Sequence, residues 1–287
     1  MKSDTLQPKC QFPIDPGGSL RELRIGYSPC PNDTYIFHDL VHRNVNVPGY
    51  RIVEELHDVE TLNRMASDGI LELTKLSFHA FLRLGDRYRL LRAGAAMGHG
   101  CGPLVVARRR LSRRELRTCR VVLPGEWTSA HLLFRLWAPE VENRFFTRYD
   151  RILETVRAGN ADCGVIIHEN RFTYQRAGFQ ALVDLGEWWE RETGLPIPLG
   201  CIAARADVPD DVKTAVECAI RKSIRNAMAA PERCLPYVRR HASEMDAEVL
   251  DRHIRTFVND YSLDLGSRGL EAVSVLRQRS REAGVTP

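Results

Sequence analysis

Short apolar runs alternate along the chain with longer segments whose apolar residues recur at helical spacing. The runs at 22–28, 50–57 and 70–77 are typical of strands, and a segment typical of a helix follows each of them. This alternation predicts an α/β fold. From Pro209 onward the pattern is almost wholly helical, so we expect a C-terminal group of helices.

Two segments of the chain, 60–78 and 151–169, share one plan. Each runs from a helix through a glycine-containing turn and a short acidic link into an apolar strand with polar residues at its exit. The match suggests two lobes of similar build, one carrying each copy. Ligands of α/β proteins bind at the carboxyl ends of strands, so the exits near Ser77 and His168 are predicted to form walls of one cleft.

The order of these segments predicts how the chain divides. We expect a disordered extension at residues 1–21, which are rich in proline, glycine and polar residues. The first lobe is expected to comprise residues 22–107 together with 203–287, and the second lobe residues 108–202.

Composition narrows the function classes. The net charge of +4 is small for 287 residues, and the densest basic run, 107–117, is typical of a solvated surface, so we expect no nucleic-acid partner. The eight cysteines form no C-x-x-C pair, which argues against a zinc ribbon and favours a reducing compartment. No apolar run has membrane-spanning length, and residues 1–22 lack the apolar segment of a signal peptide. We therefore expect a cytoplasmic protein with no membrane partner.

The stretch "SPCPNDT", residues 28–34, joins the first predicted strand to the first predicted helix. Its two prolines stiffen the approach, and Asn32, Asp33 or Thr34 is expected to cap the helix start. The turn could be purely structural, or the helix N–H groups could bind an anionic or polar group of a ligand. Cys30 would need a base and a lowered pKa to act as a nucleophile, and its sequence neighbours supply neither, so we expect it to fill space.

At a second strand-to-helix junction, Thr128 or Ser129 is expected to cap a helix that starts near Ala130. This junction, too, could bind a ligand or could be an ordinary capped helix. Lys75, among apolar neighbours at a strand end, could meet a substrate carboxylate or could be a surface lysine. The glycine loop 98–103 precedes a strand rather than a helix, so we expect a close backbone approach or a hinge and not a dinucleotide site.

His168 follows a wholly apolar strand in "GVIIHENRF". A histidine at a strand exit that faces a cleft can act as a general base, although a lone histidine is often structural. The run "HENRF" is not the H-E-x-x-H zinc motif, and we expect no metal. Glu169 and Arg171 could orient the imidazole or pair with each other. Trp188 and Trp189 could pack near the lobe crossing or form a wall for a flat ligand.

Several motifs taken together resemble one known family. They are "SPCPNDTYIF", "DVETLNRMASDG", "LTKLS", "GHGCGPLVVAR", "YDRILETVRAGNADCGVIIHENRFTY" and "DLGEWWERETGLPIPLGCI". In this order, from about Leu23 to about Ser262, the chain resembles the 1,4-dihydroxy-6-naphthoate synthases of the futalosine route to menaquinone.

The resemblance implies a two-lobe fold like that of type II periplasmic solute-binding proteins, with the active site in the cleft between the lobes. It also implies a cytoplasmic lyase that splits cyclic dehypoxanthinyl futalosine into 1,4-dihydroxy-6-naphthoate and a sugar-derived fragment, without metal or redox cofactor. Two alternatives remain: the chorismate dehydratase of the same pathway, which shares the fold class, and a non-catalytic protein that binds a small molecule.

The resemblance further implies which residues form the site. His168 matches the general base of the family, and the matching substrate contacts fall on Lys75, Leu76, Ser77, Ser129 and Ala130. The helix starts described above add Thr128 and Asn32 to this set. Serine at position 129 replaces a threonine of the family and keeps the hydroxyl, whereas Cys101 replaces an aliphatic residue, which leaves the role of the glycine loop open.

Overall fold

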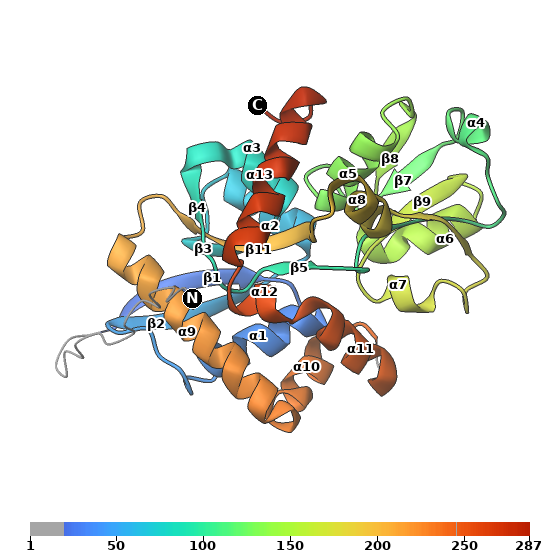
Figure 1. The fold of residues 1–287 in the computed structure, drawn as a ribbon. Helices are drawn as coiled ribbons and strands as arrows, with labels where there is room; N and C mark the ends of the chain where they lie inside the picture. Colours follow the sequence, from blue (N-terminus) through green and yellow to red (C-terminus); the bar gives the residue numbers. More distant parts are fainter. Residues whose placement is uncertain (1–19, 245) are drawn as a thin grey trace, which may run out of the picture.

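The computed structural model describes residues 20–244 and 246–287, which form two α/β lobes, each built on its own sheet (Figure 1). The two-lobe α/β architecture predicted from the sequence is confirmed. None of the described helices is long and apolar enough to cross a membrane. The expected disordered extension lies outside the described residues except for Leu20 and Arg21, and Arg21 already pairs with Tyr50 as the first residue of β1.

The first lobe holds a mixed sheet. In sheet order its strands are β2 (Tyr50–Leu56), β1 (Arg21–Tyr27), β3 (Leu73–Ser77), β11 (Ile197–Arg205) and β4 (Tyr88–Leu90), and β5 (Ala96–Gly98) also pairs with β11. β1 lies parallel to β2 and β3, whereas β11 is antiparallel to its three partners. Every residue of β3 is buried, as expected of a central strand that is covered on both faces.

The second lobe repeats this plan on a smaller scale. In sheet order its strands are β10 (Gln180–Asp184), β6 (Leu104–Ala107), β9 (Cys163–Ile166), β7 (Val121–Leu123) and β8 (Arg144–Phe146). β9 has one parallel neighbour, β7, and one antiparallel neighbour, β6, just as β3 has β1 and β11. Gly69 and Gly159, which precede these two strands, have φ of +70° and +76°. The internal repeat predicted from the sequence is therefore confirmed.

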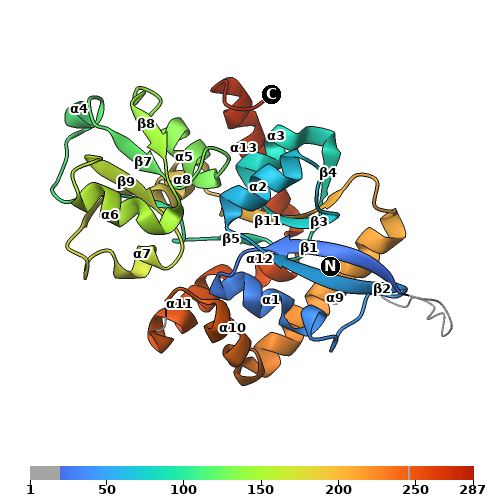
Figure 2. The ribbon, with the colours of Figure 1, turned by 180° about the vertical axis from the view of Figure 1, so that it is seen from behind.

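Helices cover both sheets. They are α1 (Pro31–Val41), α2 (Val59–Ser67), α3 (Phe78–Leu84), α4 (Arg113–Leu116), α5 (Ser129–Trp137), α6 (Ile152–Arg157), α7 (Asn170–Thr173), α8 (Leu185–Thr193), α9 (Asp210–Ala229), α10 (Leu235–His241), α11 (Ala247–Phe257), α12 (Asp260–Leu263) and α13 (Gly266–Glu282). The expected C-terminal group of helices is present, and α9, α10 and α11 pack against α1 on one side of the first sheet (Figures 1 and 2). α13 packs against β11 and α5 and so touches both lobes.

The chain crosses between the lobes twice, once between β5 and β6 and once between α8 and β11. A single apolar cluster joins the lobes, since it includes Phe78 of α3 and Phe134 of α5. The expected lobe boundaries, 107/108 and 202/203, stay a proposal for the division into domains. By sheet membership, β6 already belongs to the second lobe and the whole of β11 to the first.

Helix α8 covers a segment for which the sequence analysis predicted no helix. Trp189 on this helix is fully buried, and its Nε1 donates a hydrogen bond to the carbonyl oxygen of Pro196 at 3.1 Å. Of the two interpretations of this tryptophan pair, packing at the lobe crossing is the one that the structure supports.

The glycine loop 98–103 makes the close backbone approach that was one of its two expected roles. A Cβ on Gly102 would lie 2.1 Å from the backbone nitrogen of Gly186 in α8, and a Cβ on Gly186 would lie 2.6 Å from the backbone nitrogen of Gly102. Neither backbone can move without displacing the second sheet or α8. The contact therefore requires glycine on both sides.

We expect Gly186→Ala to lower the free energy of unfolding by about 1–3 kcal/mol, the usual range for overpacking. The sign of this change is informative, because replacing glycine by alanine inside a helix ordinarily raises the free energy of unfolding by up to about 1 kcal/mol. Urea unfolding measures the effect.

Gly269→Ala in α13 is the matched control. The atoms nearest to its Cβ would be side-chain atoms of Leu265 and Met97, at 3.3 Å, and these can give way. Equal unfolding midpoints for the two variants would contradict the interpretation of the Gly102–Gly186 contact.

Candidate active site

A cavity lies between the two lobes and encloses about 710 Å³ of empty space, part of it open to solvent. Every residue that the sequence nominated for the site lines it, namely Asn32, Lys75, Leu76, Ser77, Thr128, Ser129, Ala130 and His168. They come from the ends of β3 and β9 and from the starts of α1 and α5, where strand exits and helix N-termini converge. Whether each of them contacts a substrate stays a prediction.

The start of α1 differs from the prediction. Cys30 occupies the N-cap position, Pro31 follows as the first helical residue, and no side chain caps the helix. The expectation that Asn32, Asp33 or Thr34 caps α1 is wrong. Proline presets a helical φ, so the helix begins before these three residues, and their side chains serve other bonds.

A buried ion pair lies under the first-lobe wall of the cavity. Lys75 Nζ donates to Asp33 Oδ1 at 2.7 Å, and the two residues are 5% and 1% exposed. This burial excludes the alternative of a surface lysine. Ser28 Oγ donates to Asp33 Oδ2 at 2.7 Å, and a second N–H of Lys75 faces the carbonyl oxygen of Gly94 at 3.5 Å. One N–H of the ammonium group remains for a ligand, although Asp33 already compensates its charge.

Asn32 extends this network to a C-terminal helix. Its Nδ2 donates to Asp33 Oδ1 at 2.8 Å, and its Oδ1 accepts from His253 Nε2 of α11 at 2.9 Å. His253 is fully buried, and this burial lowers its pKa well below the ordinary value of a histidine. Its neutral ring lies parallel to that of His168, with 6.3 Å between centroids and 12° between planes.

The end of β3 is held from within the first lobe. The backbone N–H of Ser77 donates to Asn63 Oδ1 at 3.0 Å, and Ser77 Oγ accepts from Asn63 Nδ2 at 3.2 Å. Asn63 is fully buried on α2. This reciprocal pair fixes the Ser77 side chain at the cavity edge before any ligand arrives.

The second-lobe wall is the N-terminus of α5, and here the sequence prediction is confirmed. Thr128 is the N-cap residue, and its Oγ1 accepts the backbone N–H of His131 at 3.2 Å. Ser129 Oγ donates across the cleft to the carbonyl oxygen of Leu199 at 2.6 Å. The backbone N–H groups of Ser129 and Ala130 belong to the first helical turn, which has no intrahelical acceptors, so they can bind a polar or anionic group.

His168 stands just beyond β9 with a φ of +56°, the left-handed region that non-glycine residues rarely adopt. Such strain persists only where the surroundings impose it, and it is concentrated at functional sites. Burial lowers the pKa of His168 to about 4, so its imidazole is neutral near pH 7. Its buried Nε2 has no hydrogen-bond partner among the described residues. A neutral ring nitrogen without a protein partner is what a general base requires.

The Nδ1 atom of His168 contacts Cys30 of the first lobe. It lies 3.4 Å from Cys30 Sγ, so the cysteine expected to fill space instead contacts the nominated base. Cys30, His168 and Glu169 place donor atoms within 4.8 Å of one another and could hold a metal ion by distance alone. Burial raises the pKa of both the Cys30 thiol and the Glu169 carboxyl, which disfavours the deprotonated forms that bind metals.

Arg171 neither orients His168 nor pairs with Glu169, the two roles considered from the sequence. It forms an ion pair with Asp184 at 2.7 Å and donates to the carbonyl oxygens of Gly100 and Gly102. Arg171 therefore ties the glycine loop to the second lobe at the cavity edge.

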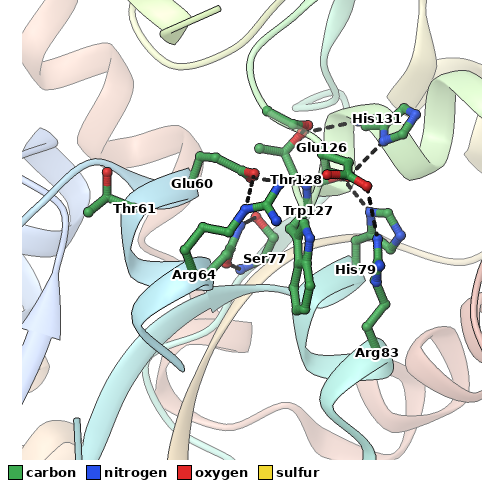
Figure 3. Close-up of polar contacts among 12 residues, drawn as sticks. Glu60, Thr61, Arg64, Ser77, His79, Arg83, Glu126, Trp127, Thr128 and His131 are labelled. Carbon is green, nitrogen blue, oxygen red and sulfur yellow. Dashed lines mark hydrogen bonds and ion pairs between the residues drawn. The ribbon is translucent and has the colours of Figure 1, made fainter. Parts of the chain in front are cut away.

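Helices α2 and α3 of the first lobe hold the loop that precedes α5 (Figure 3). Glu60 Oε2 accepts the backbone N–H of Trp127 at 3.0 Å, and Arg64 pairs with Glu126 at 2.6 Å. The guanidinium groups of Arg64 and Arg83 lie 5.2 and 4.2 Å from the centroid of the Trp127 ring. These contacts cross the cleft and keep the start of α5 over the cavity.

Some cavity residues carried no signal in the sequence. Phe257 lines the cavity from the end of α11, and His253 of the same helix reaches Asn32. Helical periodicity identifies both as inward-facing, but it does not tell which strand exit they approach. Ser28 lay inside a recognised motif, and only the folded loop shows that it bonds Asp33.

Solved structures define the class of fold. A protein from Archaeoglobus fulgidus superposes with a TM-score of 0.87 at 33% identity, over 92% of this chain and 98% of that one. An alkanesulfonate-binding protein from Xanthomonas axonopodis pv. citri, bound to MOPS, superposes with a TM-score of 0.71 at 14% identity, over 94% and 96% of the two chains. The predicted fold like that of periplasmic binding proteins is confirmed.

Sequence relatives define the family. The family described as menaquinone biosynthesis matches residues 23–282. A 1,4-dihydroxy-6-naphthoate synthase of Thermus thermophilus is 48% identical over 93% of this chain and 96% of its own length. A second synthase of that name, from Streptomyces coelicolor, is 42% identical over 92% and 95%. The chain therefore belongs to the menaquinone biosynthesis family, and the resemblance to these lyases that the motifs predicted is confirmed.

Two buried histidines beside the cleft predict how stability depends on pH. Burial lowers the pKa of His79 to about 3 and that of His131 to about 4. Below the unfolded value of 6.5, the unfolded chain binds protons that the folded chain does not. The free energy of unfolding should therefore fall as the pH drops from about 6.5 to about 4, by up to about 1.4 kcal/mol per pH unit for each histidine.

Urea unfolding at a series of pH values measures this dependence. His79→Gln should give a shallower slope than the unchanged chain between pH 6.5 and 4, because one of the buried histidines with a lowered pKa is no longer present. Parallel curves for the two proteins would contradict the assignment.

Proposed function

We propose that the chain converts cyclic dehypoxanthinyl futalosine into 1,4-dihydroxy-6-naphthoate and a sugar-derived fragment, with His168 as the general base. The observation that carries this proposal is the unpartnered Nε2 of a strained, neutral histidine in a cavity shared by both lobes. Membership of the menaquinone biosynthesis family supports the choice of reaction. A cytoplasmic location and a reaction that needs no cofactor stay predictions from the sequence and the resemblance.

In this mechanism His168 Nε2 removes a proton from a carbon of the bound substrate. The electron pair of the broken C–H bond enters the ring system that becomes the naphthoate, and the sugar-derived fragment departs by elimination. Formation of an aromatic product supplies driving force. With a pKa near 4 the imidazole is neutral at pH 7, and its ring nitrogen can accept a proton. A pKa this far below the working pH also makes it a weak base, so orientation has to contribute more of the rate.

The remaining cavity residues would bind and orient the substrate. The free N–H groups of Ser129 and Ala130 and the third N–H of Lys75 offer donors to its polar or anionic groups. Leu76, Ile167 and Phe257 give the cavity apolar surface that suits a carbocyclic ring. General base catalysis contributes roughly 10²–10⁴-fold, so orientation in the closed cleft has to provide much of the remaining rate enhancement.

Separate incubations with two substrates test the reaction. With cyclic dehypoxanthinyl futalosine we expect 1,4-dihydroxy-6-naphthoate in the mass spectrum, and with chorismate we expect unchanged chorismate. Dehydration of chorismate would favour the dehydratase alternative. Saturable binding of the futalosine derivative without any product would favour a non-catalytic binding protein.

His168→Asn tests the base. We expect kcat to fall by about 10²–10⁴-fold with a small change in KM, because asparagine can hydrogen bond but cannot accept the proton. His42→Asn, at the far end of α1 from the cavity, is the matched control and should keep its activity. Near-normal turnover by His168→Asn would show that another group is the base.

A further inference from the structure

The N-terminus of α5 is hydrogen bonded to the first lobe through His79, the second residue of α3. His79 is buried, and its ring nitrogen Nδ1 lies 3.2 Å from the carbonyl oxygen of Thr128, the N-cap residue of α5 (Figure 3). Its backbone N–H donates to Ser129 Oγ at 3.4 Å. A single first-lobe residue therefore bonds both residues at the start of α5.

The partner atom fixes the direction of the ring contact. A carbonyl oxygen can only accept a hydrogen bond, so Nδ1 of His79 carries the proton and donates it to Thr128. Burial lowers the pKa of His79 to about 3, so the ring is neutral at pH 7 and Nε2 holds a lone pair. Nε2 is buried and has no hydrogen-bond partner among the described residues. The opposite tautomer would set a lone pair against the carbonyl oxygen and would leave an N–H buried at Nε2.

The hydroxyl group of Ser129 also bonds the first lobe. Its proton goes to the carbonyl oxygen of Leu199 in β11 at 2.6 Å, and one of its lone pairs accepts the backbone N–H of His79. A hydroxyl group has one proton, so none is left for a ligand while these contacts persist. The donor that Ser129 can offer to the cavity is therefore its backbone N–H, and the same is true of Ala130, whose side chain is apolar.

Both first-lobe partners of Ser129 are backbone groups at places where regular pairing is interrupted. The N–H of His79 belongs to the first turn of α3, which has no intrahelical acceptor, and no side chain caps this helix. Leu199 lies where the pairing of β11 with β5 shifts its register. β3 pairs with β11 and runs directly into α3, so the two groups belong to one frame.

We propose that His79 is a positioning residue that holds the N-terminus of α5 across the cleft, so that the backbone N–H groups of Ser129 and Ala130 face the substrate. The proposal rests on the proposed function, in which these N–H groups bind a polar or anionic group of the substrate. His79 is not among the residues that line the cavity, and it acts through Thr128 and Ser129.

Variants at position 79 separate the hydrogen bond to Thr128 from the packing of the ring. His79→Phe keeps an aromatic ring but has no donor. In His79→Asn the amide nitrogen is as many bonds from Cα as Nδ1 is in histidine, so it can still donate to Thr128. In His79→Gln the amide nitrogen corresponds to Nε2 instead, so this variant should behave like His79→Phe.

Kinetics with cyclic dehypoxanthinyl futalosine test the effect on binding. His79→Phe should raise KM about tenfold, the loss expected for one hydrogen bond, with kcat little changed. The loss appears in KM because the N–H groups of α5 bind the substrate before and during the reaction, whereas the proposed base lies on another element. His79→Asn should recover part of the loss. An unchanged KM in His79→Phe, or equal KM values in His79→Phe and His79→Asn, would overturn the proposal.

His38→Phe is the matched control. It removes another buried histidine, which pairs with Asp39 on α1 and is not among the residues that line the cavity. This variant should keep the KM of the unchanged chain. A tenfold rise in His38→Phe as well would show that the effect of His79→Phe is not specific to the start of α5 and would overturn the proposal.

Amide hydrogen exchange without substrate tests the contact independently of the reaction. The backbone N–H of residue 79 bonds Ser129 Oγ, so its protection from exchange reports whether the start of α5 stays in place. Protection at residue 79 should be about tenfold lower in His79→Phe than in the unchanged chain, with His79→Asn between the two. Equal protection in all three proteins would overturn the proposal.

The two tests separate this inference from the function on which it rests. If every protein lacks activity on cyclic dehypoxanthinyl futalosine but protection at residue 79 changes as expected, the proposed reaction is wrong and the positioning of α5 by His79 stands. If the unchanged chain forms the naphthoate but KM and protection do not respond, the positioning is wrong and the reaction stands. If His79→Phe does not fold, as judged by circular dichroism, His79→Gln takes its place with the same expected results.

Discussion

The buried ion pair between Lys75 and Asp33 is the interaction on which the cavity depends. Two charges taken out of water need each other, and removing one partner of such a pair typically costs about 3–5 kcal/mol. Here the pair also fixes the hydrogen-bond direction of its neighbours. Ser28 donates to one carboxylate oxygen, and Asn32 donates to the oxygen that Lys75 holds. The first-lobe wall is consequently formed before a ligand binds.

The second lobe forms the opposite wall of the cavity with a strained histidine, His168, and the open N-terminus of α5. Neither is complete alone, because His168 meets Cys30 across the cleft and Ser129 donates to Leu199 across the cleft. Contacts of Glu60, Arg64 and Arg83 with the loop before α5 hold the same two walls together. The fold is shared with proteins that bind small molecules, so the chemistry resides in these side chains and not in the architecture.

Much of the site could be predicted from the sequence because strand exits and helix starts are local patterns. Thr128 at the start of α5 and the paired exits of β3 and β9 follow from capping preferences, glycine turns and apolar runs. The prediction failed for α1, where proline at position 31 moved the helix start and released three polar side chains for other bonds. Contacts of His253 and Phe257 could not be predicted, because their helix lies far along the chain and reaches the cavity through tertiary packing on α1 and β5.

The sequence by itself determined the alternation of strands and helices, the internal repeat, the family and eight of the residues that line the cavity. These properties depend on local spacing and on motifs, which a single chain displays without its fold. The tertiary structure decided what those residues do to one another. Only folding brings Cys30 to His168 and Asp33 to Lys75, since each pair joins segments far apart in sequence. Burial in the folded chain then raises the pKa of the Cys30 thiol and lowers that of the His168 imidazole, because it disfavours the charged form of each group.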